Sequence, residues 1–230
     1  IWDFDEVQLR RYDVPDIFNL TKIKMETALA QYFHKDGSLA LFNGTSSSNL
    51  ETIKLCLSKK QSIRKLIFPN NSSGIFYLED KNKKIFIDAI QPTHSSHSKG
   101  LSAGTLSIEF SAGKEKIITN CGALERTTGN AAYLRYSAAH STIILENTNI
   151  SEIRDHQPHI KYPQIVSFKK EREGIKHLIE MSHNGYVKNF NKIVKRKVHF
   201  EENKNYLNGE DLIISSISKN KEIIFHIRFH

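Results

Sequence analysis

The spacing of apolar residues changes once along this chain, and that change constrains the fold more than any other feature. Up to about residue 64 apolar residues recur at helical spacing, whereas beyond it they alternate with polar residues in short runs. A helix is expected from Asp16 to about Phe33. Its apolar residues near one face are Ile17, Leu20, Ala28 and Tyr32. The S-x-x-E pattern over 48–51 is a capping box that predicts a second helix, so residues 1–64 form a helical segment.

Short strands with turn residues between them are predicted for the remainder, 65–230. Residues 74–78 and 85–90 flank a Lys/Asn turn as a hairpin, and 105–110 alternates with Leu106, Ile108 and Phe110 inward. Further strands are expected over 116–119, 142–145, 164–168, 177–181, 193–200 and 222–229. The fold class predicted is therefore mainly β: an antiparallel β-sandwich preceded by a short α-helical segment.

Charge suggests an acidic partner without naming one. The chain has 33 Lys and Arg against 25 Asp and Glu, a formal net charge of +8, which suits nucleic acid, an anionic polysaccharide or a membrane surface. The basic runs 81–84 and 192–197 are interpreted as solvated surface. No nucleic-acid-binding signature accompanies them, and no apolar run reaches the roughly 18–20 residues of a membrane span. We therefore expect neither nucleic acid nor a membrane span.

Single motifs carry little information about function. The pairs His94/His97 and His156/His159 lie in loop-like sequence, which does not hold two imidazoles rigidly for a metal. Two cysteines cannot make a four-thiolate zinc site. No G-x-S-x-G motif of a nucleophilic serine occurs. The chain starts without Met and ends within a strand-like run, so we expect a fragment cut inside a domain. The termini carry no readable export signal.

An ordered series of short stretches is more specific. In chain order these are HKDGSLALFNG (34–44), residues 73–92, GTLSIEF (104–110), IITNCGA (117–123), SAAHST (137–142), SHNGY (182–186), LNGED (207–211) and IRFH (227–230). The series resembles the C-terminal region of heparinase II/III-like proteins, a family of polysaccharide lyases and their relatives, over about 31–230. In that family an incomplete α/α toroid joins an antiparallel β-sandwich. The resemblance thus implies that 1–64 ends the toroid and that 65–230 is the sandwich domain, truncated at its C-terminus.

The implied activity is β-elimination at a uronic acid of an acidic polysaccharide, which makes the parent protein a carbon–oxygen lyase if it keeps the toroid residues. The family's proton-transfer residues lie mostly on the toroid, upstream of this chain, so the fragment alone is expected to be inactive. His140, Arg135 and Tyr186 are the candidate substrate-binding residues. Family members are typically periplasmic or secreted, and we expect the same of the parent.

The family's zinc positions are altered here. They fall on Ser102, Asn120 and His140, and the histidine that the sandwich normally supplies falls on Gly100. Serine and asparagine are poor zinc ligands, so we expect no bound metal and no other cofactor.

Other interpretations remain open from the sequence. The sandwich could be a non-catalytic carbohydrate-binding or structural module that has lost lyase activity, and nucleic-acid binding would rest on charge alone. His140 suits either a functional role or a hydrogen-bonded structural one. Tyr186 is by default a core residue and 209–211 a turn.

Overall fold

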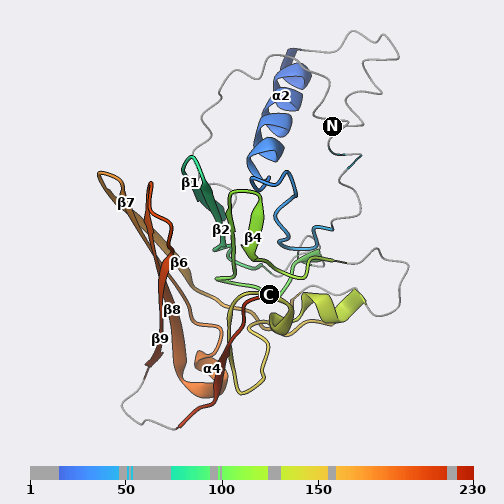
Figure 1. The fold of residues 1–230 in the computed structure, drawn as a ribbon. Helices are drawn as coiled ribbons and strands as arrows, with labels where there is room; N and C mark the ends of the chain where they lie inside the picture. Colours follow the sequence, from blue (N-terminus) through green and yellow to red (C-terminus); the bar gives the residue numbers. More distant parts are fainter. Residues whose placement is uncertain are drawn as a thin grey trace.

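The architecture is a β-sandwich with one long helix packed at its edge, seen in a computed structural model (Figure 1). The structure describes residues 16–46, 51, 53, 74–93, 98, 100–123, 131–154, 159–216 and 222–230. The predicted capping box at 48–51 lies outside them except for Glu51, so the second helix stays a prediction. The division of the chain at residue 64 also stays a prediction.

Two four-stranded antiparallel sheets form the sandwich among the described residues. The first has the order β1 (Ile75–Glu79), β2 (Lys83–Asp88), β3 (Ile108–Ala112) and β4 (Glu115–Ile118). The second has the order β6 (Val166–Glu173), β7 (Lys176–His183), β8 (Lys192–Glu201) and β9 (Asn208–Ser215). A short ladder pairs β10 (Phe225–Ile227) with β5 (Ile143–Leu145). The predicted fold class is confirmed.

The core lies between the two sheets because each strand alternates apolar residues toward the other sheet. Ile85, Ile87 and Phe110 of the first sheet and Ile179 and Val198 of the second share one buried cluster. A stacked ring pair crosses from sheet to sheet, Phe76 on Phe168, with centroids 3.5 Å apart. The side chains of Leu106, Ile108 and Phe110 are buried as predicted, but the predicted strand 105–110 begins only at Ile108, because Leu106 has a φ of 64° and lies in a turn.

Short helical elements connect some of the strands. Two 3-10 helices, η2 (Ala131–Arg135) and η3 (Ser137–Ala139), precede β5, and a single α-helical turn, α4 (Val187–Phe190), joins β7 to β8. In Figure 1, α4 and the long helix α2 (Asp16–Gln31) lie at opposite ends of the molecule.

Helix α2 confirms the predicted helix but not its predicted apolar face. Ile17 is 64% exposed and Leu20 44%, whereas Glu26 and Thr27 are buried. The C-terminal half of the helix is the part that packs, because the chain leaves it directly into the loop that covers the first sheet. Sequence periodicity located the helix but misjudged which residues it buries.

The interpretation of 81–84 as solvated surface is wrong for its last two residues. Lys83 and Lys84 belong to β2 and are 2% and 5% exposed. The Lys83 ammonium donates to the Glu201 carbonyl at 2.7 Å, which links the two sheets, and the Lys84 ammonium donates to the Gln31 carbonyl at 2.7 Å, which holds the end of α2. Each buried cation is thus hydrogen-bonded, as burial of a charge requires.

The basic run 192–197 is also only partly solvated. Lys195 and Lys197 pair with Glu180 on the outer face, but Arg196 is 3% exposed. Its guanidinium makes two bonds to the Asp211 carboxylate, at 2.7 and 2.9 Å. The predicted turn at 209–211 is therefore wrong: these residues lie in β9, paired with β8.

Candidate functional site at the junction of the helical segment and the sandwich

Hydrogen bonds join three of the segments singled out by the sequence. They are the loop 32–46, the stretch 100–107 before β3, and the η2–η3 segment, with the residues after β4 between them. Ser102, Asn120, His140 and Arg135 all lie here, so the structure brings four of the five predicted site residues into one buried region. Tyr186 lies elsewhere, under α4.

A buried histidine–carboxylate pair joins the loop to the sheet. His34 Nε2 donates to Glu109 Oε2 at 2.7 Å, and both side chains are 0% exposed. The other carboxylate oxygen, Oε1, accepts from the backbone N–H groups of Leu41 (3.1 Å) and Asn120 (2.9 Å). His34 Nδ1 lies 2.9 Å from Ser111 Oγ. This pair therefore fixes the loop after α2 on the first sheet and holds Asn120 in place.

A second buried carboxyl group lies at the end of β2. Asp88 is 3% exposed, and burial raises its pKa to about 7, against the lowering effect of hydrogen bonds from Ile90 N–H and Asn43 Nδ2. Asn43 Oδ1 in turn accepts from the backbone N–H of Ser102 at 3.2 Å. An Asp whose pKa lies near 7 is a proton donor or acceptor poised for neutral pH, and here it is linked to a family metal position.

His140 is held as a neutral ring. It is 2% exposed, and burial lowers its pKa to about 4, with the nearby His230 acting in the same direction. The ring packs on Gly104, where a Cβ would lie only 2.9 Å from His140 Cγ. The next residue, Ser141, donates its backbone N–H to Asn120 Oδ1 at 2.9 Å. His140 and Asn120 are thus neighbours, as the resemblance implied.

Arg135 and Tyr186 have different surroundings. The Arg135 guanidinium is half-buried and donates from Nε to the Leu101 carbonyl at 3.1 Å, so a cation sits beside Ser102. Tyr186 is 0% exposed, and its hydroxyl donates to the Thr148 carbonyl at 2.9 Å. Tyr186 therefore packs in the core, where the structure offers a ligand no direct access to it.

The donor set does not fit zinc. Ser102, Asn120 and His140 supply only one strong zinc ligand, and Asn120 Oδ1, the oxygen that could coordinate a metal, already accepts from Ser141. Among the described residues no group of three His, Cys, Asp or Glu side chains could hold a metal ion. We derive no chemistry from a metal here, and the absence of zinc remains a prediction.

The sequence reading missed three residues of this region: His34, Asp88 and Glu109. Alternation puts Glu109 on the outward face of its strand, because Ile108 and Phe110 point inward. The loop 32–46 covers that outward face and so buries Glu109. The sequence gives only a weak indication that Asp88 is functional, namely that a carboxylate ends an apolar strand. It gives no indication for His34, since its partner Glu109 is 75 residues away.

Comparison with known proteins gives the family. The model of the heparinase II/III-like C-terminal domain matches residues 64–230. The chain belongs to the heparinase II/III-like family. No match was found among curated proteins.

Solved structures share the fold. Heparan sulfate lyase HepC from Pedobacter heparinus has a TM-score of 0.62 and 17% identity, covering 92% of this chain and 35% of that one. Two heparinase III structures give TM-scores of 0.62 and 0.60 at 17% and 14% identity, covering 87% and 88% of this chain and 33% and 35% of theirs. The present chain thus spans about a third of each. The confirmed resemblance makes this heparinase II/III-like chain a relative of polysaccharide lyases.

Proposed function

We propose that this chain is the C-terminal part of a polysaccharide lyase that cleaves a uronic-acid-containing acidic polysaccharide by β-elimination. The observation that carries the proposal is the family match over 64–230, joined to a fold shared with a heparan sulfate lyase over 92% of the chain. The formal charge of +8 suits an acidic substrate. The parent would be periplasmic or secreted, and no described helix is long and apolar enough to cross a membrane.

The reaction defines what the whole protein must supply. A base removes the C5 proton, the C5–H electron pair forms the C4–C5 double bond, and the C4–O4 bond breaks as an acid protonates the leaving O4. Neutralising the uronate carboxylate lowers the cost of the charge that develops at C5. We propose that the proton-transfer groups lie outside residues 1–230, so that this chain alone is inactive.

The role proposed for this chain is to bind and position the substrate beside the catalytic site. Arg135 carries a permanent positive charge beside Ser102, and we propose that it contacts a substrate carboxylate. His140 is neutral and packed on Gly104, and Tyr186 is buried, so their proposed contribution is to position the η2–η3 segment and the loop before it. The His34–Glu109 pair keeps that surface fixed against α2.

The alternative is a non-catalytic carbohydrate-binding or structural module. One observation favours it: the positions where the family has its sandwich histidine and two zinc ligands hold Gly100, Ser102 and Asn120. A chain that has lost lyase activity would no longer need those side chains.

A lyase assay on the full-length parent and the 230-residue chain separates the two. Each is incubated with heparin, heparan sulfate, alginate, hyaluronan and pectate, and the ultraviolet absorbance of the unsaturated uronate is followed. Product from the parent alone is the expected result. A parent that binds these glycans but forms no product on any of them would favour the module.

A further inference from the structure

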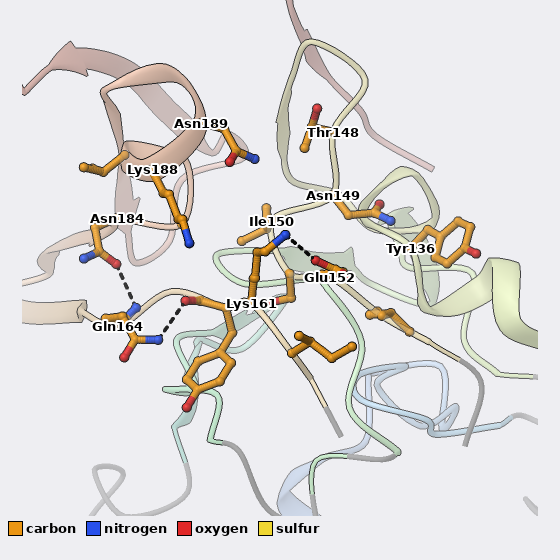
Figure 2. A pocket seen from close by; sticks show the side chains of 16 residues that line it. Tyr136, Thr148, Asn149, Ile150, Glu152, Lys161, Gln164, Asn184, Lys188 and Asn189 are labelled. Carbon is orange, nitrogen blue, oxygen red and sulfur yellow. Dashed lines mark hydrogen bonds and ion pairs between the residues drawn. The ribbon is translucent and has the colours of Figure 1, made fainter. Parts of the chain in front are cut away.

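A large open pocket adjoins α4, which Figure 1 shows at the other end of the molecule from α2. Its volume is about 740 Å³, and its walls come from Tyr136 and from three segments, 148–153, 160–164 and 184–189 (Figure 2). This volume suits one or two sugar residues, since small-molecule pockets run from about 300 to 1,000 Å³. Among the lining residues, Tyr136, between η2 and η3, belongs to the junction region.

The walls are held in place by their own hydrogen bonds. Asn184 Oδ1 accepts from the backbone N–H groups of Gln164 (2.9 Å) and Ile165 (3.0 Å), which fixes the loop before β6. Asn149 Oδ1 accepts from Ser137 N–H at 2.9 Å, which fixes the opposite wall. Asn184 Oδ1 thus accepts two hydrogen bonds and Asn149 Oδ1 accepts one. These bonds fix the loops on two sides of the pocket.

The charges at the pocket favour an anion. Figure 2 shows the ammonium groups of Lys188 and Lys161 reaching into the same space from different walls. Lys161 pairs with Glu152 at 2.7 Å, and Arg154 shares that carboxylate at 3.0 Å. Lys188 is exposed and forms no ion pair with any described carboxylate. The cations thus outnumber the single carboxylate, and Lys188 is left to bind an anionic ligand group.

The apolar part of the pocket distinguishes a sugar from a bare anion. Ile160, 36% exposed, and Val187 form part of the lining. Tyr136 also lines the pocket, and its ring makes an edge-on contact with Tyr133, with centroids 5.6 Å apart and planes at 90°. Such surface suits the C–H face of a pyranose, whereas a small inorganic anion would gain nothing from it.

We propose that this pocket binds an acidic sugar residue, with Lys188 pairing with its carboxylate or sulfate group. This inference rests on the proposed function, because an acidic polysaccharide supplies the ligand. It adds a glycan-binding site formed entirely by this chain.

The test is binding to the 230-residue chain, measured by calorimetry at low salt. The probes are a hexasaccharide of alternating glucuronate and N-acetylglucosamine, neutral chitohexaose, and sodium sulfate. The pocket variant is Lys188→Ala, at an exposed side chain, and the matched control is Lys204→Ala, an exposed lysine outside the pocket. Loss of one charge-assisted bond should weaken binding by about tenfold or more in Lys188→Ala, with no change in the control.

Three results decide the matter. Binding of the acidic hexasaccharide, weak binding of chitohexaose and amide shifts confined to 148–153, 160–164 and 184–189 in NMR spectra support the proposal. Equal losses in Lys188→Ala and Lys204→Ala would mean only general charge attraction and would overturn it. Sulfate binding as tight as that of the sugar would reduce the site to an anion site and overturn the sugar assignment. The readout is binding, so a lyase-inactive parent would refute the proposed function and leave this inference intact.

Discussion

Removing the His34 side chain should loosen the junction between α2 and the sandwich. Glu109 Oε2 has no described partner besides His34, because the other donors bind Oε1. His34→Ala would therefore leave a carboxylate oxygen buried without a hydrogen bond and would also remove the imidazole ring that packs edge-on against Phe86 at 4.8 Å. Leaving a buried polar group without its hydrogen bond costs about 1–3 kcal/mol, and more when the group is charged, so His34→Ala should cost about 3 kcal/mol. His34→Gln can still donate to Oε2, and should cost about 1–2 kcal/mol.

Urea unfolding measures the difference. With a slope of about 2–3 kcal/mol/M, His34→Ala should lower the midpoint by about 1–2 M, and α2 should lose protection from hydrogen exchange before the sheets do. The matched control is Lys169→Ala, which removes an exposed ion pair with Glu171 and should leave the midpoint unchanged. An unchanged midpoint in His34→Ala, or equal protection of α2, would refute the reasoning.

Four further predictions follow from the buried polar groups. The pKa of Asp88 rises from 3.8 to about 7 on folding. The stability that its proton provides is therefore complete below about pH 4 and is lost as the pH rises to 7. Asp88→Asn should flatten the fall in Tm between pH 5 and 8, and parallel curves of Tm against pH for the two proteins would contradict this prediction. Gly104→Ala should lower the free energy of unfolding by about 1–3 kcal/mol, because the added methyl group presses on the His140 ring. The same substitution should cost less in a chain that also carries His140→Ala. If the two losses simply add in thermal unfolding, the contact is excluded. Arg196→Lys should lower stability by roughly 2–3 kcal/mol in urea unfolding, because an ammonium cannot make the bidentate bond to Asp211; a cost near zero would show that the pair is dispensable. Zinc and EDTA should each leave Tm unchanged. A stoichiometric metal content in mass spectrometry would contradict the conclusion that Ser102, Asn120 and His140 do not bind zinc.

Hydrophobic periodicity was sufficient for the architecture. Runs such as 75–79 and 85–87 became strands whose alternate residues, Phe76, Leu78, Ile85 and Ile87, face the core between the sheets. The same rule failed where a second layer covers a strand. Lys83 and Lys84 look like turn residues, yet each reaches a specific carbonyl group from a buried position, and only the three-dimensional fold supplies those partners.

The site was harder to predict than the fold for the same reason. The resemblance located Ser102, Asn120 and His140, and the structure brings them into one region with Arg135. It could not reveal the two carboxyl groups that organise that region, Asp88 and Glu109, because their burial depends on the loop that follows α2. Strand β9 was missed because Asn208 and Gly209 are turn formers, and pairing with β8 outweighs that preference.

The central claim is that the parent of this chain cleaves its glycan by elimination. The most direct test is to digest the preferred acidic polysaccharide with the parent protein in heavy-oxygen water and weigh the products by mass spectrometry. Elimination predicts an unsaturated uronate at the new non-reducing end and no heavy oxygen at the new reducing end, because the C4–O4 bond breaks without water. Products that carry one heavy oxygen and no double bond would identify a hydrolase and contradict the account.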